Sequence, residues 1–244
     1  LTPAKNFLVN NHIYHMGVYR KGDSAVQCSG CGNRVANNEI HDIPRIGVIF
    51  NGNDHVVEYN HIHHCNLEIE DTGAIYLGGV SWTIRGNVIR YNFIHDTGGY
   101  GRAGDHWAYP YYSWGIYLDD WASGTHVYGN IVARTYLAAI HDHSGRDNLI
   151  ENNIFVDGLR AQAQFSAWPT THKALPKMFE EIAAMGWPKG RYPGLDRIQD
   201  PVRDATMSFN VFRRNIVYYN NPESLLYSCS GLVFEEHTSD YNCL

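Results

Sequence analysis

The chain has 244 residues and a formal net charge of −6, and only 18% of its residues are charged. This length buries a hydrophobic core without disulfide bonds, and a hydrophobic content of 44% excludes a disordered chain. The acidic balance argues against a nucleic-acid partner, because binding phosphates needs a basic face. No apolar run is long enough to span a membrane. The polar content is carried by uncharged side chains, including 21 Asn, 23 Gly, 14 His and 17 Tyr.

Both ends of the chain are abrupt, since a repeating pattern is already under way by Val9 and stops at Leu244 without a closing segment. We therefore expect a piece of a longer protein, secreted or periplasmic, although the chain itself carries no leader peptide. Five cysteines fall at irregular spacing. Cys28 and Cys31 form a CxxC pair without a second pair at zinc-ribbon distance, which favours a local disulfide or two buried thiols over a metal site.

A degenerate repeat organises the chain. One unit has the form Asn-x-Ile or a close variant and ends at Ile13, Ile40, Ile62, Ile94, Ile131, Ile154 and Ile216. Its short steps of 22 and 23 residues set the period, and the longer steps contain insertions. A second unit, a small residue followed by a short alternating strand, occupies 17–21, 47–51, 74–78, 115–119 and 139–143. Short β-rich runs with this period predict an all-β fold, a parallel β-helix of about seven coils in one domain, 1–244.

Asparagine has a structural role in this fold. An inward Asn at a corner bonds the backbone of the coils above and below, and Asn and Gly tolerate the left-handed conformation of sharp corners. Two insertions interrupt the period. Residues 98–112 are rich in Gly and aromatic residues, and residues 166–205 contain an amphipathic stretch, 176–185, which predicts a helix. This helix either covers one side of the β-helix or forms a lid over a cleft.

Alternation along the second unit predicts which side chains face outward. Val18, Val48, Ile75, Ile116 and Ile140 are expected to point inward. The outward positions then form two columns: Tyr19, Ile49, Tyr76, Tyr117, His141 and Gln164 in one, and Lys21, Asn51, Gly78, Asp119, His143 and Ser166 in the other. Lys, Glu, Thr or Ser is usual at exposed positions, so this mixture indicates a binding or catalytic cleft.

The corner units and the segment 115–120, Gly-Ile-Tyr-Leu-Asp-Asp, resemble the pectin-lyase-like right-handed parallel β-helix superfamily. Together with 70–76, Glu-Asp-Thr-Gly-Ala-Ile-Tyr, they are similar to its bacterial glycoside hydrolases of the α-L-fucosidase/xylanase type, over residues 9–165. The Asp-Asp pair followed about one coil later by a His is also similar to polygalacturonase-type hydrolases. The resemblance implies a right-handed helix and a secreted enzyme that degrades a plant, algal or microbial polysaccharide.

Glycoside hydrolysis needs one protonated and one ionised carboxyl group. Asp119 and Asp120 are neighbours that raise one another's proton affinity, and both serve one site only if the strand ends or bulges there. Asp71 is the third candidate catalytic acid. We expect the substrate to be bound by His141, His143, Tyr117, Tyr76, Trp107, Trp114, Trp121, Gln164 and Asn51, because aromatic faces pack on sugar rings. We expect no cofactor and no metal at these residues, with a structural or substrate-bridging calcium ion left open.

A second histidine cluster follows the corner units. His41, His63 and His95 recur on successive coils, with Asp42, His64 and Asp96 beside them. Stacked rings arise wherever a coil repeats, whereas imidazole and carboxylate together are also competent metal ligands.

Three hypotheses for function remain open. The first is a glycoside hydrolase that uses Asp119. The second is a polysaccharide lyase or epimerase in which Lys21, Arg45 or Arg160 neutralises a uronate while a His or Tyr takes the proton. The third is a β-helix that binds glycans or proteins without catalysis. All three leave the oligomeric state open.

Overall fold

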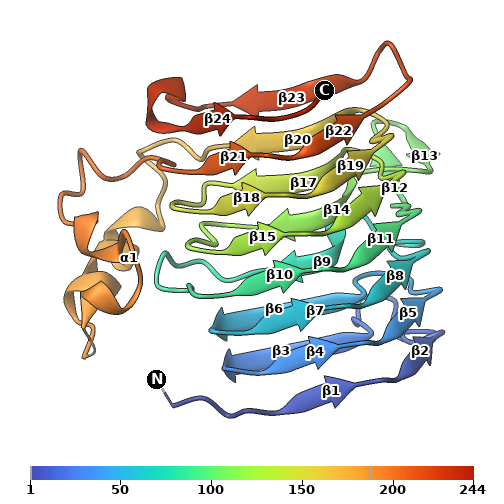
Figure 1. The fold of residues 1–244 in the computed structure, drawn as a ribbon, viewed down its shortest axis with the longest axis horizontal. Coiled ribbons are helices and arrows are strands. Elements are labelled where there is room, and N and C mark those ends of the chain that lie inside the picture. The colour runs from blue at the N-terminus through green and yellow to red at the C-terminus, as the bar shows by residue number, and fades with distance from the viewer. Residues whose placement is uncertain (1, 187) are drawn as a thin grey trace.

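The computed structural model describes residues 2–186 and 188–244. Three parallel sheets run along the molecule, and successive strands of the chain pass from one sheet to the next, so that each turn of the chain adds one coil (Figure 1). This is a parallel β-helix, as the repeat predicts. Within the described residues, no helix is long and apolar enough to cross a membrane.

Sheets A and B consist of three-residue strands. Sheet A contains β1 (Phe7–Val9), β4 (Arg34–Ala36), β7 (Val56–Glu58), β10 (Val88–Arg90), β15 (His126–Tyr128), β18 (Leu149–Glu151), β21 (Val211–Arg213) and β24 (Thr238–Asp240). Sheet B contains β2 (His12–Tyr14), β5 (Glu39–His41), β8 (His61–His63), β11 (Phe93–His95), β16 (Ile131–Ala133), β19 (Ile154–Val156) and β22 (Ile216–Tyr218).

Sheet C consists of six-residue strands and carries the outward columns of the sequence pattern. It contains β3 (Val26–Cys31), β6 (Val48–Asn53), β9 (Thr72–Leu77), β14 (Ser113–Leu118), β17 (Ala138–His143), β20 (Ala161–Ser166) and β23 (Leu225–Ser230). The strand pairing aligns Ile49, Tyr76, Tyr117, His141 and Gln164 on neighbouring strands, as the period predicts.

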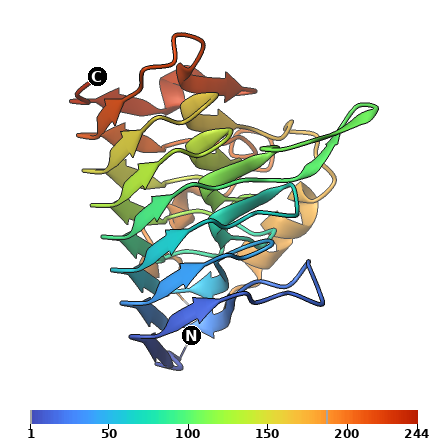
Figure 2. The ribbon, with the colours of Figure 1, turned by 90° about the vertical axis from the view of Figure 1, so that its right-hand side faces the viewer.

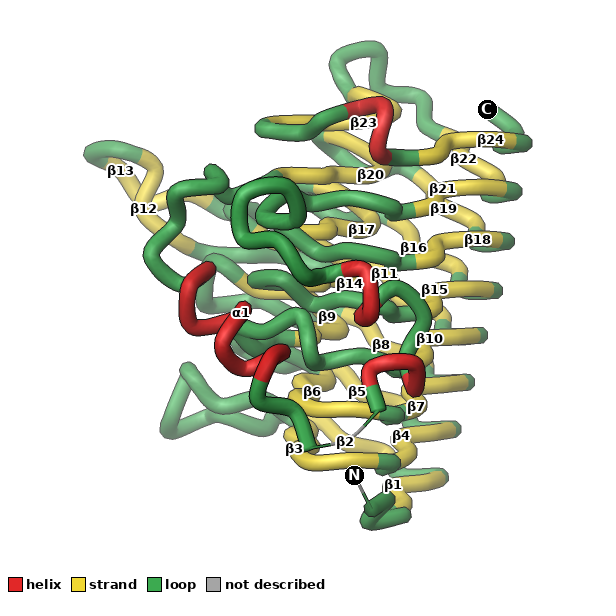
Figure 3. Tube along the Cα trace, turned by 90° about the vertical axis from the view of Figure 1, so that its left-hand side faces the viewer, coloured by secondary structure: helices red, strands yellow, loops and turns green. Residues whose placement is uncertain are grey.

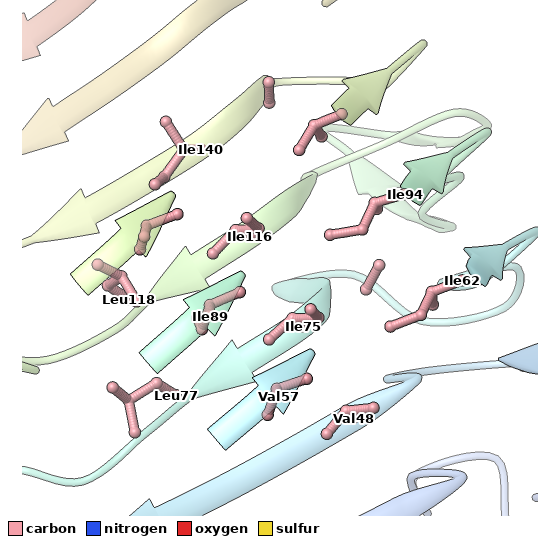
Figure 4. Close-up of a cluster of buried hydrophobic side chains, with 14 of the residues drawn as sticks. Val48, Val57, Ile62, Ile75, Leu77, Ile89, Ile94, Ile116, Leu118 and Ile140 are labelled. Atoms are coloured by element: carbon pink, nitrogen blue, oxygen red, sulfur yellow. The ribbon is translucent and has the colours of Figure 1, made fainter. Parts of the chain in front are cut away.

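The core is a stack of aliphatic side chains that point between the three sheets. Val48, Ile75, Ile116 and Ile140 from sheet C are fully buried and meet Ile62 and the other inward residues of sheets A and B (Figure 4). Each inward position repeats once per coil, so a coil buries its apolar residues only when its neighbours are present.

The structure corrects the sequence analysis in the first coil. The strand of sheet C in this coil is β3, and Gln27 pairs with Ile49. The segment 17–21 is a loop in which Val18 is 55% and Tyr19 99% exposed. The apparent match failed because this coil has a longer connection than the next one before its sheet C strand.

In three coils the buried residue of the corner unit lies one position after the isoleucine that the sequence pattern predicts. Ile94 pairs with Val132, and Val132, Phe155 and Val217 are the buried residues of their strands. The preceding residues Ile131 and Ile216 are 41% and 49% exposed. The true anchor is the asparagine, which keeps its place on every coil while the apolar residue follows two positions later.

Two insertions lie at opposite ends of the sheet C strands. Before β14, the short antiparallel strands β12 (Gly101–Ala103) and β13 (His106–Ala108) form a hairpin that projects from the molecule (Figure 2). After β20, the chain forms α1 (Leu175–Ala183) and the short 3-10 helices η1 (Lys189–Arg191) and η2 (Leu195–Arg197), which lie beside the coils (Figure 3). A further 3-10 helix, η3 (Phe234–Glu236), follows β23.

Helix α1 packs against the β-helix through its apolar face. Met178 and Ile182 are 1% exposed and form a second hydrophobic cluster with Trp82 and Trp121. The helix therefore holds the insertion beside the carboxyl ends of the sheet C strands, where the outward column ends in Asp119 and His143. All five cysteines are free thiols.

Candidate active site

A hydrogen-bonded group of polar side chains lies at the carboxyl ends of β14 and β17. Leu118 pairs with Asp142, so the next residues, Asp119 and His143, are neighbours across the two strands. Alternation turns both of them outward, and His143 Nδ1 donates to Asp119 Oδ1 over 3.0 Å. This pair is the centre of the site.

Tyr76 on β9 completes a three-residue chain. Its hydroxyl donates a very short hydrogen bond to Asp119 Oδ2. A Cβ atom at position 78 would come within 2.5 Å of the Tyr76 ring, so Gly78 gives the ring the room that it needs to reach Asp119. Asp119 therefore joins a phenol and an imidazole from two different coils.

Asp120 reaches the same site because the strand ends at Leu118. Asp120 and Trp121 both have left-handed backbone conformations, with φ of 35° and 66°, which break the alternation of the strand. The Asp120 Oδ1 atom lies 3.6 Å from His143 Nδ1 and accepts a hydrogen bond of 2.7 Å from Trp168 Nε1. Two adjacent acids can thus face one site, which the sequence analysis had made conditional on such a break.

Asp71 approaches from the turn before β9. It also has a left-handed conformation, with φ of 54°, and its Oδ1 accepts a hydrogen bond of 3.4 Å from the Tyr117 hydroxyl. Asp71 is exposed, whereas Tyr117 is 3% exposed. The three acids proposed from the sequence are therefore linked through Tyr76, Tyr117 and His143.

The environment separates the proton affinities of these acids. Burial acts to raise the pKa of Asp119, but hydrogen bonds from His143 and Tyr76 outweigh it, so the pKa lies below its ordinary value. Burial and the negative charge of Asp119 raise the pKa of Asp120. The pKa of Asp71 is also raised, because its carboxyl group is partly shielded from water although the residue as a whole is exposed, and because Asp119 is negatively charged. Asp119 is thus the ionised member, and Asp120 and Asp71 are the acids that hold a proton more readily.

His141 lies under this surface. It is 3% exposed, stacks on Tyr117 with ring centroids 4.8 Å apart, and its Nε2 is 2.7 Å from Ser166 Oγ. Burial, with the nearby His143, lowers the pKa of His141 to about 3, so its ring stays neutral. The pattern placed His141 at the surface. The structure corrects this, because the flanking aromatic rings cover it.

The other expected sugar-binding residues are dispersed. Trp114 and Trp121 are buried, the first donating through Nε1 to Gln164 Oε1 over 2.8 Å and the second packing in the cluster of α1. Trp107 is 65% exposed on the hairpin and stacks on Tyr100. Asn51 is exposed on β6, and Gln164 is partly exposed on β20. The structure thus brings Asp119, Asp120, Asp71, His143, Tyr76 and Tyr117 together and leaves Trp107 apart.

Two residues of the insertion were missed by the sequence analysis. Trp168 packs 4.8 Å from the His143 ring and bonds Asp120, and His172 lies 5.0 Å from Trp168 between ring centroids. Trp168 follows two residues after Ser166, which the column count had placed beside His143. Trp168 lies beyond the end of β20, in an irregular segment whose path the column count does not predict.

The basic residues considered for a uronate have partners elsewhere. Lys21 forms an ion pair with Glu68 at 2.7 Å, Arg45 donates to the Gly22 carbonyl, and Arg160 lies over the Tyr136 ring. Within residues 2–186 and 188–244, Asp71, Asp119 and Asp120 form no ion pair with Lys or Arg. The carboxylates of this site are therefore contacted by tyrosine, tryptophan and histidine side chains, and not by lysine or arginine.

Among the residues that the structure describes, two groups of His and acidic side chains lie close enough together to hold a cation. In the active-site candidate, ligand atoms of Asp119, Asp120 and His143 all lie within 4.8 Å of one another. The other group is Glu39, His61 and His63 on sheet B. Hydrogen bonds within the site already satisfy Asp119 from both sides, so its arrangement stands without an ion.

Comparison with known proteins shows the family to which the chain belongs. Residues 24–167 match the model of the family described as the right handed beta helix region, and the chain belongs to this family. The match confirms the right-handed parallel β-helix and the pectin-lyase-like superfamily. A search among curated proteins found no match.

Solved structures share this fold. The chain is similar to the periplasmic alginate epimerase AlgG, with 14% sequence identity and a TM-score of 0.54 over 98% of this chain and 44% of that one. A mutant of the same epimerase gives 12% identity and a TM-score of 0.55, covering 97% of this chain and 49% of the other. The chain thus spans less than half the length of these neighbours, and identity at this level describes the fold alone.

Proposed function

We propose that the chain acts on a uronate-containing polysaccharide and moves the proton on the carbon next to the uronate carboxylate, as an epimerase or a lyase. The observation that carries the proposal is the chain Tyr76–Asp119–His143, in which one ionised carboxylate orients both an imidazole and a phenol. An imidazole held by a carboxylate is a general base, and a phenol is a proton donor. The similar structure, AlgG, is described as an alginate epimerase, which supports the same class of reaction.

The proposed step is balanced by these groups alone. His143 takes the proton and leaves the electron pair on the carbon, delocalised into the uronate carboxylate. In an epimerase, a phenol returns a proton to the opposite face of that carbon. In a lyase, the electron pair instead forms a double bond and expels the neighbouring glycosidic oxygen, which takes its proton from the Tyr76 phenol. In both reactions the proton on His143 then returns to the phenolate, so that both groups are restored. Burial and the charge of Asp119 raise the pKa of Tyr76 well above its ordinary value, so the phenol keeps its proton at neutral pH.

The uronate carboxylate needs a partner that offsets its charge. Asp120 and Asp71, the acids with raised pKa values, can be this partner when they are protonated, because a carboxylic acid donates a hydrogen bond to a carboxylate. The indole N–H of Trp168 donates to Asp120 and so lies beside the proposed position of the uronate carboxylate. This replaces the Lys or Arg of the sequence-based hypothesis.

Glycoside hydrolysis is a second candidate, favoured by the opposed pKa shifts of Asp119 and Asp120. Their carboxylate oxygens lie within 4.8 Å of one another. Inverting enzymes separate the two carboxyl groups by about 6.5–9.5 Å to admit a water molecule, so this pair would work with retention.

One experiment distinguishes these reactions. Alginate and other polyuronates are incubated with the protein in D₂O, and the products are examined by NMR, ultraviolet absorbance and a reducing-end assay. An epimerase introduces deuterium next to the carboxylate without new reducing ends. A lyase gives an absorbing unsaturated product. New reducing ends without deuterium or absorbance would show hydrolysis and overturn the proposal.

Three variants test the residue roles. We expect His143→Gln, Asp119→Asn and Tyr76→Phe each to lower turnover at least 100-fold, since general acid–base groups contribute about 10²–10⁴-fold. His126→Gln is the matched control, because His126 also contacts a carboxylate, Glu151, at 3.1 Å, but on sheet A. Full activity in the Asp119→Asn variant with an intact fold would refute both proton transfer and hydrolysis at this site.

The proposal also places the protein outside the cytoplasm. Polysaccharides of this type are extracellular polymers, and the similar epimerase is described as periplasmic. We propose a secreted or periplasmic location, which fractionation of expressing cells with an antibody against the chain would test.

A further inference from the structure

Sheet B carries a second concentration of ionisable side chains, away from sheet C. On its outer face, His12, Glu39 and His61 form one column across β2, β5 and β8, and Tyr14, His41, His63 and His95 form the next column. These strands are stacked above one another in Figure 1. The proposed reaction on sheet C uses none of these residues.

Glu39, His61 and His63 point at a common centre. Glu39 Oε1 lies 3.7 Å from His61 Nδ1 and 3.8 Å from His63 Nε2. Both distances are too long for hydrogen bonds. With metal–ligand distances of about 2.0–2.2 Å, two ligands of a tetrahedral zinc ion lie about 3.4 Å apart. The Glu39 oxygen therefore lies at nearly ligand spacing from both imidazole nitrogens, too far for direct hydrogen bonds, and ligand atoms of the three residues all lie within 4.8 Å of one another.

A chain of hydrogen bonds connects His61 to Arg134 on the outer face of sheet B. Arg134 binds Asp96 through two bonds of 2.6 and 2.8 Å, and Asp96 Oδ2 lies 2.6 Å from His95 Nδ1. The carboxylate can only accept, so His95 carries its proton on Nδ1. His61 Nε2 lies 2.8 Å from His95 Nε2. When His61 donates this bond, its Nδ1 presents a lone pair to the Glu39 carboxylate.

The ring of His63 is fixed in a similar way. It is stacked between the rings of His41 and His95, with interplanar angles of 3° and 2°. Its Nδ1 lies 2.8 Å from His64 Nδ1. When His63 donates this bond, its Nε2 also presents a lone pair to Glu39. Two lone pairs and a carboxylate oxygen that face one centre repel one another unless a cation lies between them.

We propose that Glu39, His61 and His63 form a binding site for a transition-metal ion of the zinc class. Two imidazoles and one carboxylate are the ligands that suit zinc, whereas calcium and magnesium prefer oxygen ligands alone. Three protein ligands leave a fourth position open to solvent. Since Glu39 pairs with His61 across β5 and β8, the ion fastens two adjacent coils. The chain from His61 to Arg134 is the outer support that such ligands usually have.

The test uses zinc itself and the full chain. Protein freed of metal by dialysis against a chelator is titrated with Zn²⁺ by calorimetry. We expect one ion per chain, at least tenfold weaker binding in Glu39→Gln, and a larger loss in the double variant His61→Gln, His63→Gln. His126→Gln is the control for a histidine–carboxylate contact on another sheet. Asp119→Asn is the control for the other possible ligand group, and both controls should bind zinc like the original chain.

Spectroscopy of the unmodified protein makes the result independent of how the variants fold. X-ray absorption at the zinc edge should show two imidazole ligands and an oxygen shell. An original chain that binds no Zn²⁺, a double variant with unchanged affinity, or a zinc spectrum without imidazole would overturn the proposal. Loss of binding in Asp119→Asn alone would also overturn it, because the ion would then belong to the acids of sheet C.

Discussion

At the scale of single residues, the candidate site depends on positions that have no charge themselves. Gly78 is the clearest example. It stands in the outward column between Asn51 and Asp119, and its missing side chain leaves the place that the Tyr76 ring occupies. The hydrogen bond from Tyr76 is one of those that hold the pKa of Asp119 below its ordinary value. A glycine on one coil therefore contributes, through Tyr76, to the lowered pKa of an acid on the next coil.

We accordingly predict that Gly78→Ala disturbs the site more than the fold. The added Cβ would displace the Tyr76 ring, the bond to Asp119 would be lost, and the pKa of Asp119 would rise. We expect turnover to fall at least tenfold and the acidic limb of the pH–rate profile to move to higher pH. Gly22→Ala is the control, since a Cβ there meets nothing within 4 Å. If the pH–rate profile does not move in Gly78→Ala, the hydrogen bond from Tyr76 does not control the pKa of Asp119.

A second prediction for a single residue concerns the buried carboxyl group of Asp142. Its side chain points into the core, fully buried, where Gly145 N and Asn148 Nδ2 donate to it over 3.0 and 2.9 Å. Burial raises its pKa from 3.8 to about 7. Because the folded state then holds a proton that the unfolded chain has released, stability falls as pH rises between these two values, by up to about 1.4 kcal/mol per pH unit.

The comparison that isolates this effect is with Asp142→Asn, whose side chain does not titrate. We expect the free energy of unfolding of the original chain, relative to this variant, to decrease as pH rises from 4 to 7 and to level off above 7. Urea unfolding at a series of pH values measures it. A constant difference across this range would mean that Asp142 keeps an ordinary pKa in the folded protein.

At the scale of elements, the insertion after β20 completes the candidate site. Helix α1 anchors it through Met178 and Ile182, and the segment before the helix carries Trp168 to Asp120 and His143. The β-helix alone would present its acids on an open surface. The insertion contacts them on one side, and its Trp168 donates a hydrogen bond that acts to lower the pKa of Asp120 against the effect of burial.

Trp168→Phe tests this role without removing the aromatic ring. Phenylalanine can still pack on His143 but cannot donate to Asp120, and this hydrogen bond is one of the effects that lower the pKa of Asp120. A hydrogen bond to a charged group contributes about 1.5–3 kcal/mol, so we expect the limb of the pH–rate profile that belongs to Asp120 to rise by about one pH unit. Trp107→Phe on the exposed hairpin should leave the profile unchanged. An equal shift in both variants would contradict the assignment.

At the scale of the whole molecule, periodicity made the fold predictable because every coil repeats the same requirements. Inward Ile75, Ile116 and Ile140 follow from alternation alone. The first coil could not be placed, because the loop at 17–21 imitates the strand unit and only the paired neighbour, Ile49, shows that Gln27 belongs in the column. The slip at Ile131 has a similar cause, since two adjacent apolar residues fit the unit equally well.

The candidate site was predictable only in part, for a different reason. Columns on consecutive strands follow from the period, so Asp119 and His143 could be placed side by side. Trp168 and His172 arrive from an irregular segment, whose path depends on packing rather than on the repeat. Asp71 could be named as a candidate acid, but its contact with Tyr117 could not be predicted. Burial is also a property of the assembled molecule, which is why His141, outward by alternation, is covered in the structure.

The asparagine ladder joins the coils along the whole molecule. On each coil the backbone N–H and side-chain Nδ2 of one asparagine donate to the Oδ1 of the next. The ladder runs through Asn11, Asn38, Asn60, Asn92, Asn130, Asn153, Asn215 and Asn242. The left-handed conformation falls on the residue before each ladder asparagine, such as Tyr91 or Asn152, and not on the ladder residue itself. The ladder asparagine is therefore selected for its hydrogen bonds.

Asn92→Ala should consequently cost far more than a change at a corner. Asn92 Oδ1 accepts from both donors of Asn60 at 3.0 Å, and its Nδ2 donates to the Val57 carbonyl. Alanine leaves these buried groups without partners, at about 1–3 kcal/mol each, so we expect a loss of about 3 kcal/mol or more in the free energy of unfolding. Asn152→Ala, at a left-handed and exposed corner, should cost only about 1 kcal/mol. Denaturant unfolding of both variants measures the contrast. Equal losses would show that the corner backbone, and not the ladder, fixes asparagine at these positions.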